Sequence, residues 1–194
     1  MEHRRTLGVA QKITVNLGRS FVLGAALCVA GSLAMAGTMA KLNDAQIAHI
    51  AYTAGKIDVE AATLALKMTH NPAVKAFAEE MERDHASVNK HALVLVETLK
   101  MKPEDNDTSK ALVVAATQKR QELSKLSGAA FDSAYIQNEV TYHQTVNGAL
   151  EGTLIPDAQN SELKAFLKTG LKLFKEHQMH AERLVNELPR SLAR

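Results

Sequence analysis

The sequence predicts an all-α protein. Hydrophobic residues make up 46% of its 194 residues, whereas aromatic residues make up only 4% and tryptophan is absent. A chain rich in Ala and Leu and poor in aromatic residues favours helices over strands. From residue 44 onwards, apolar residues recur at intervals of three and four, which is the period of an amphipathic helix.

Residues 1–36 have the organisation of a secretory signal peptide. Four basic residues precede an apolar run over 21–34, and Ala34-Met35-Ala36 forms a small-x-small cleavage motif before Gly37. A membrane anchor is the alternative, but the many Gly, Ala and Ser residues of the run favour cleavage. We therefore expect export to the periplasm or cell envelope, with residues 37–194 forming one domain and 42–188 its core.

Cleavage would change the charge and chemistry of the chain. Removing four basic residues and one acidic residue leaves 19 Lys and Arg against 20 Asp and Glu, a net charge of −1. Nothing then favours a nucleic acid or an anionic membrane surface as a partner. The only cysteine, Cys28, lies in the apolar run, so the mature protein would have no thiol chemistry and no membrane span.

Two long helices are expected first. The apolar stripe of 44–69 begins after Asn43, with Asp44 as the expected N-cap. Asn71-Pro72 interrupts the pattern and places proline in a first turn, where it is tolerated. The stripe of the second helix then continues over 72–101, and Pro103 follows its end.

The second half of the chain predicts a short helix and two more long ones. The short helix is expected over 108–126, followed by the break Ser127-Gly128. Long helices are expected over 129–153 and 161–188, with a turn at 156–160 between them and Pro189 as the stop. The chain thus predicts two helical hairpins joined by a long connection that carries a short helix.

Four polar side chains fall on the apolar stripes of these helices, namely His85, Glu139, His143 and His177. Burying a charge or an imidazole is costly unless it is paired or bound. Ferritin-like bundles meet that cost by holding metal between carboxylates and imidazoles on facing helices.

The topology follows from the heights of these residues along the helices. At a rise of about 1.5 Å per residue, Glu60, Glu82 and His85 lie level across the first hairpin. Glu139 and His143 join this level only if the short helix returns the chain along the bundle. His177 and His180 then lie level on the last helix. We therefore predict a ferritin-like four-helix bundle with one long crossover that carries the short helix.

The spacing within each helix also favours a metal site. The candidate ligands are Glu60, Glu82, His85, Glu139, His143, His177 and His180. Imidazole and carboxylate without thiolate suit Fe, Mn, Zn or Cu and do not select among them. Asp84 and Glu176 are the expected outer partners that orient an imidazole, and Tyr135 is a further neighbour for which core packing is favoured. A buried hydrogen-bonded His/Glu network without metal remains the alternative.

Three segments carry a resemblance to a known family: NPAVKAFAEEMERDHASVNK (71–90), FDSAYIQNEVTYHQTVNGALE (131–151) and LFKEHQMHAERL (173–184). They resemble an exported bacterial ferritin-like family of unknown function, family 4142, whose members are often labelled outer-membrane or secreted proteins. The resemblance covers about residues 42–188 and implies a ferritin-like bundle. Glu82 does not match a fixed part of that pattern, which argues for a histidine-rich, mononuclear site rather than a di-iron one.

Three functions are compatible with the sequence. The first is an exported metal-binding bundle that buffers metal or protects against metal or oxidative stress. The second is a non-catalytic envelope module whose polar core is structural. The third, least favoured, is a redox enzyme built on a metal centre; no catalytic residue is predicted, and a protein without enzymatic activity is preferred.

Overall fold

A computed structural model describes residues 41–191, all of them helix, turn or connecting loop, with no strand within this range. The expected signal peptide and Cys28 lie outside the described residues. The helices are α1 (Asp44–Met68), α2 (Pro72–Thr98), α3 (Asp107–Leu123), α4 (Gly128–Ala149), the π-helical segment η1 (Leu150–Leu154), α5 (Ile155–Asp157) and α6 (Ser161–Ser191). The all-α class is confirmed.

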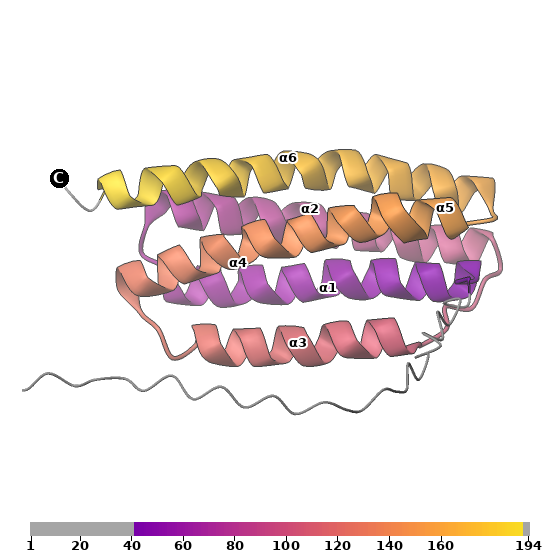
Figure 1. The fold of residues 1–194 in the computed structure, drawn as a ribbon, viewed down its shortest axis with the longest axis horizontal. Helices are drawn as coiled ribbons and strands as arrows, with labels where there is room; N and C mark the ends of the chain where they lie inside the picture. The colour runs from indigo at the N-terminus through magenta and orange to yellow at the C-terminus, as the bar shows by residue number, and fades with distance from the viewer. Residues whose placement is uncertain (1–40, 192–194) are drawn as a thin grey trace, which may run out of the picture. The chain divides into compact units, whose positions relative to one another are not determined.

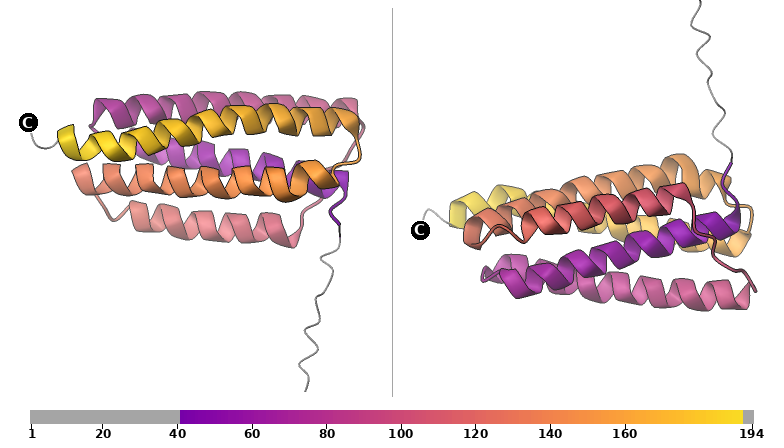
Figure 2. Two further views of the ribbon diagram at one scale, coloured as in Figure 1. Left: turned by 45° about the horizontal axis from the view of Figure 1, so that its top comes forward. Right: turned by 90° about the horizontal axis from the view of Figure 1, so that it is seen from below.

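The helices form a bundle of two antiparallel pairs, α1 with α2 and α4 with α6 (Figures 1 and 2). Helix α3 lies beside α1 and returns the chain from the end where α2 finishes to the end where α4 begins (Figure 1). As a result α2 and α4 begin at the same end of the bundle. Only with this connection do the polar residues expected in the core lie at one level along the bundle.

The helix starts are fixed by side-chain caps. Asn43, and not Asp44, caps α1: its Oδ1 accepts from the Gln46 backbone N–H at 2.8 Å, and Gln46 Oε1 accepts from the Asn43 N–H at 3.1 Å. The Asp44 carboxylate instead accepts from the backbone N–H groups of Gln159 and Asn160, at 2.7 and 2.9 Å. It thereby ties the start of α1 to the turn before α6.

Two helix ends differ from the expectation. The helix beginning at Gly128 leaves the α-helical path at Leu150, passes through the π-helical turn and includes Pro156 in α5, where a turn was expected. Helix α6 continues to Ser191, so the expected stop at Pro189 is wrong. A proline in the last turn of a helix removes only one hydrogen bond, which a long packed helix tolerates.

Two apolar clusters fill the interior. One joins Phe77, Met81 and Tyr135 with the end of α6, and the other joins Ile47 and Ile50 with Leu163, Leu167 and neighbouring residues. On the four long helices, one buried polar residue each lies between residues of the first cluster and residues of the second, namely Asp58, His85, His143 and His177. The polar layer is therefore in the middle of the bundle, closed by apolar side chains on both sides.

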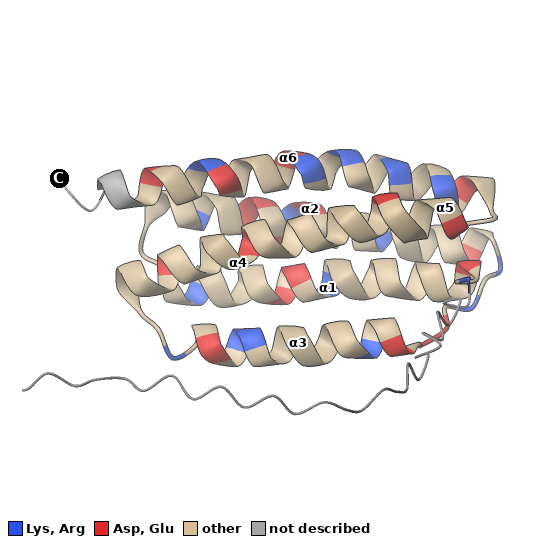
Figure 3. Ribbon diagram, in the orientation of Figure 1, with Lys and Arg blue, Asp and Glu red and all other residues tan. Residues whose placement is uncertain are grey.

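None of the helices in residues 41–191 combines the length and apolar character that crossing a membrane requires. Basic and acidic residues are interspersed along α3 and α6 (Figure 3).

Candidate metal centre

Three imidazoles from three helices converge in the polar layer. His85 comes from α2, His143 from α4 and His177 from α6, and each is at most 3% exposed. Their ring centroids are 5.3 to 5.6 Å apart, and one potential ligand atom from each lies within 4.8 Å of the others. Such atoms share a centre about 3 Å away, so small movements would reach metal–nitrogen distances of about 2.0–2.1 Å.

Two carboxylates complete this group, which we call the central cluster: Asp58, His85, Glu139, His143 and His177. Asp58 and Glu139 are each 1% exposed and, with His143, also offer ligand atoms within 4.8 Å of one another. Asp58 Oδ2 lies 3.4 Å from His85 Nε2 and 3.6 Å from His143 Nε2. The cluster therefore presents three nitrogens and two carboxylates in one buried volume.

Outer hydrogen bonds determine which nitrogen of two imidazoles faces the cluster. His143 Nδ1–H donates to the backbone carbonyl of Glu139 at 3.0 Å, which leaves the Nε2 lone pair free to bind a cation. His177 Nε2–H donates to Asp84 Oδ2 at 3.1 Å, which leaves the Nδ1 lone pair. Metal-binding histidines are commonly oriented in this way by a carboxylate or a carbonyl on the other nitrogen.

The inward-facing atoms of the cluster lack hydrogen-bond partners among residues 41–191. These atoms are both carboxylate oxygens of Asp58, both ring nitrogens of His85, Glu139 Oε2, His143 Nε2 and His177 Nδ1. A buried polar atom without a partner costs about 1–3 kcal/mol. A bound cation would satisfy several of them at once.

Burial sets the protonation of the cluster. It lowers the pKa of His85 well below 6.5, with the neighbouring imidazoles adding to the effect, and lowers the pKa of His143 to about 4. Burial likewise lowers the pKa of His177, against the opposing hydrogen bond to Asp84. The three imidazoles are therefore neutral at pH 7, which is the form that binds metal.

The two carboxylates shift in the opposite direction. Burial raises the pKa of Asp58 to about 8. Burial, and then the charge of Asp58, raises the pKa of Glu139 well above 4.5. In the metal-free protein Asp58 therefore retains its proton near neutral pH, and a cation would have to displace it.

The expected outer partners divide into one that contacts the cluster and one that does not. Burial tends to raise the pKa of Asp84, but hydrogen bonds from Arg83 and His177 lower it overall, so its carboxylate is ionised and accepts from His177. Glu176 is exposed on α6 and makes no hydrogen bond to His177 among those of the described residues. Tyr135 is fully buried, and Glu139 and Asp58 add to the effect of burial in raising its pKa, so it is a neighbour of the carboxylates.

Three of the predicted ligands do not join the cluster. Glu60 is half-buried and pairs with Arg120 at 2.8 Å and Lys56 at 3.8 Å. Glu82 accepts a hydrogen bond from Thr63 Oγ1 at 2.8 Å. His180 Nδ1 contacts Glu80 Oε2 at 2.7 Å. None of the three belongs to a group of converging ligand atoms within the described residues.

Two acidic residues that the sequence analysis missed lie at the site. Asp58 is in the cluster itself, and Glu80 forms a half-buried group with Asp84 and His177 whose potential ligand atoms also lie within 4.8 Å. A signal for Asp58 was available, because it lies four residues after Ala54 and three before Ala61, both on the buried stripe of α1. Glu80 lies at the edge of its stripe and gave no comparable signal.

Comparisons with known proteins agree with this description. The chain resembles a solved structure of a candidate secreted protein, DUF305, from Streptomyces coelicolor, with a TM-score of 0.63 and 12% identity over 74% of this chain and 92% of that one. At this identity the likeness concerns the fold alone. No curated protein matches the sequence. The model of DUF4142, a domain of unknown function, matches residues 30–184, and the chain therefore belongs to the DUF4142 family.

Proposed function

We propose that this protein is an exported helical bundle that binds a transition-metal ion through the central cluster. His85, His143 and His177 would supply nitrogen ligands, and Asp58 and Glu139 would supply oxygen ligands. Its role would be metal buffering or protection against metal or oxidative stress outside the cytoplasm. The observation that carries the proposal is the set of buried inward-facing nitrogen and oxygen atoms without hydrogen-bond partners within residues 41–191.

The chemistry of the donors supports a first-row transition metal. Neutral imidazoles suit Zn, Cu and Fe, and carboxylates extend the range to Mn. Carboxylates and imidazoles held between facing helices are also the ligands of ferritin-like metal bundles. The crossover through α3 supports that topology for this chain. The signal-peptide pattern of residues 1–36 and the candidate secreted protein of similar fold support export.

The direct test is elemental analysis after refolding with Fe, Mn, Zn or Cu. The wild-type protein should retain one of these metals through gel filtration, and the His85→Ala/His143→Ala variant should lose most of it. The matched control is His70→Ala/His91→Ala, because both histidines are exposed and lie near or on the same helix α2. Equal metal contents in the two double variants would contradict the proposal.

A structural polar network is the second candidate. The distances of 3.4 and 3.6 Å from Asp58 Oδ2 to His85 and His143 favour it, because small side-chain rotations would turn them into hydrogen bonds. Such a network predicts that chelators and added metals leave the stability of the protein unchanged.

A further inference from the structure

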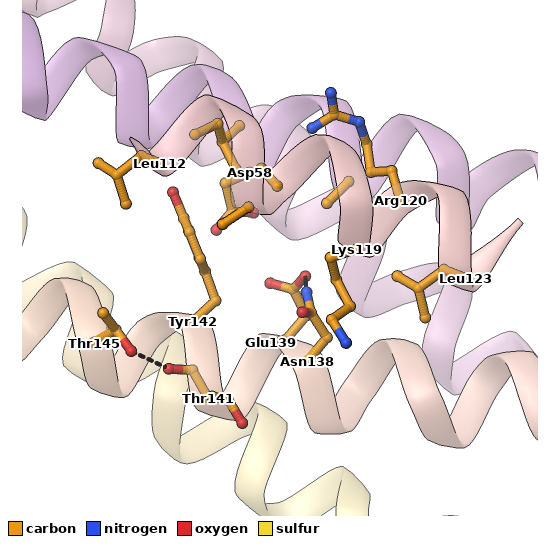
Figure 4. Close-up of a pocket in the computed structure, with 14 residues that line it drawn as sticks. Asp58, Leu112, Lys119, Arg120, Leu123, Asn138, Glu139, Thr141, Tyr142 and Thr145 are labelled. Carbon is orange, nitrogen blue, oxygen red and sulfur yellow. Dashed lines mark hydrogen bonds between the residues drawn. The ribbon is translucent and has the colours of Figure 1, made fainter. Parts of the chain in front are cut away.

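A cavity of about 230 Å³ lies between α1, α3 and α4, beside the central cluster (Figure 4). About 10–15 Å³ admits one water molecule, so this cavity can hold a ligand of several non-hydrogen atoms. Its walls are mainly apolar, formed by Ile57, Ala61, Leu112, Ala116 and Leu123 among others. Exposed residues such as Thr141 and Thr145 form its rim, so it communicates with solvent.

The inner end of the cavity is formed by two members of the central cluster. Asp58 and Glu139 both line it, and Figure 4 shows them with Tyr142 beside the space under α3. Each carboxylate is only 1% exposed, so a molecule in the cavity would reach a cation behind them after a small movement of these two side chains. A cation held by Asp58, Glu139 and His143 would therefore be adjacent to any molecule in the cavity.

Two cationic side chains of α3, Lys119 and Arg120, line the same cavity, and each is paired with a carboxylate. Lys119 Nζ lies 2.6 Å from Glu122 Oε2. Arg120 Nη2 is held by Glu60 at 2.8 Å, whereas its Nη1 is buried and has no hydrogen-bond partner within the described range 41–191. An unpartnered buried guanidinium nitrogen favours an anionic or carbonyl oxygen as its ligand.

We propose that this cavity binds a small organic monocarboxylate in a metal-dependent manner. The head group would lie toward the metal face of Asp58 and Glu139 and the guanidinium of Arg120, and the hydrocarbon tail would pack against the apolar wall. Without a cation, the two acidic side chains offer a carboxylate head no favourable charge. A cation with an open coordination position would instead accept an oxygen of the carboxylate head as a further ligand. This inference rests on the proposed metal site.

Butyrate is the probe for the test, titrated by calorimetry into protein loaded with the metal identified by elemental analysis and into the same protein treated with EDTA. Ala116→Phe should fill the cavity, and Val113→Phe is the matched control because Val113 is exposed on the same helix and does not line the cavity. We expect butyrate to bind the metal-loaded protein, to bind at least tenfold more weakly after EDTA, and to lose at least tenfold in affinity in Ala116→Phe alone.

The outcomes separate this inference from the proposed function. Metal retention without butyrate binding, or equal butyrate affinity in the two Phe variants, would overturn the cavity assignment and leave the metal site intact. Failure to retain any metal would overturn both. The metal content of Ala116→Phe, compared with that of the wild type, shows whether the variant keeps its fold and cluster.

Discussion

At the scale of single residues, burial shifts the pKa values of the imidazoles and of the carboxylates of the central cluster in opposite directions. The imidazoles of His85, His143 and His177 are neutral because burial lowers their pKa. Asp58 and Glu139 have raised pKa values for the same reason. Proton release on metal binding near neutral pH should therefore come from Asp58 rather than from the imidazoles.

This charge distribution predicts how stability depends on pH in EDTA-treated protein. A raised folded-state pKa contributes stability at low pH that is lost as the pH rises through that pKa. Unfolded imidazoles, with a pKa of about 6.5, are about three-quarters neutral at pH 7 and almost fully neutral at pH 8, so they add only a small rise in stability. Asp58, with a folded pKa of about 8, retains most of its proton at pH 7 and loses it progressively through this interval. The free energy of unfolding should fall over this interval, by up to about 1.4 kcal/mol per pH unit for each such carboxylate.

Urea unfolding at pH 7 and 8 measures this slope. Asp58→Asn should reduce it, because the amide does not titrate. Asp107→Asn makes the same change at a fully exposed position and should keep the wild-type slope. A wild-type stability that rises from pH 7 to 8 would show that Asp58 is ionised in the folded protein.

The hydrogen bond from His177 to Asp84 predicts a specific loss of metal affinity. Asp84→Asn removes the ionised acceptor that orients the imidazole, and loss of such an outer partner typically costs 10–100-fold in metal affinity. Glu176→Gln is the control, since Glu176 is exposed one residue before His177. Competition with a chromogenic chelator gives both affinities; similar values would remove Asp84 from the orienting role.

The residue scale also shows where sequence reasoning succeeded and failed. His85, His143, His177 and Glu139 could be found because polar residues on an apolar stripe are conspicuous. Asp58 was missed because the prediction considered only the position along the helix axis, which selected Glu60. Two residues along a helix rotate the direction of a side chain by about 200° around that axis. Rotation around the axis, as well as height, decides which carboxylate faces the interior.

At the scale of elements, helices α1 and α2 approach closely at Gly55. A β-carbon at this position would collide with the side chain of Asn89 on α2. Gly148 on α4 is exposed and has open space around it. The two glycines thus provide a matched pair for testing how tightly the first hairpin is packed.

Alanine at each glycine should have opposite effects on the free energy of unfolding. Gly148→Ala should stabilise the protein by about 0.5–1 kcal/mol because it removes the flexibility of a mid-helix glycine. Gly55→Ala should destabilise it by about 1–3 kcal/mol through overpacking. Chemical denaturation measures both, and equal stabilisation by the two substitutions would show that Asn89 moves aside without cost.

The order of the helices and their approximate limits could be predicted, because apolar period and proline positions are local signals. The residues that cap the helices, and the irregular turns at their ends, could not be predicted. Asn43 rather than Asp44 caps α1 because Asp44 is engaged by a turn 115 residues further along the chain. The π-helical turn at Leu150–Leu154 likewise carries no clear local signal.

At the scale of the whole molecule, the polar layer separates two apolar clusters and is contributed by all four long helices. The connection through α3 could be predicted because only this connection brings the histidines to one level. The cavity beneath α3 could not be predicted, because it depends on the shapes of side chains, which a periodic pattern of apolar residues does not encode.

Metal binding at such a layer should stabilise the entire bundle. A ligand present at 100 times its dissociation constant adds about 2.7 kcal/mol when it binds only the folded state. For a domain of this size that corresponds to an increase of roughly 5–10 °C in Tm. Calorimetric scans with and without the retained metal measure the shift, and an unchanged Tm would favour the structural network instead.

The contacts of Asp44 and Leu42 with the segment before α6 join parts of the sequence that lie far apart. The carboxylate of Asp44 accepts from Gln159 and Asn160, and the Leu42 N–H donates to Asp157. The start of α1 is also joined to the loop after α2, where the Glu104 N–H donates to the Ala45 carbonyl at 3.0 Å. A change at Asp44 would therefore loosen two distant parts of the chain at once, namely the first helix and the turn before the last.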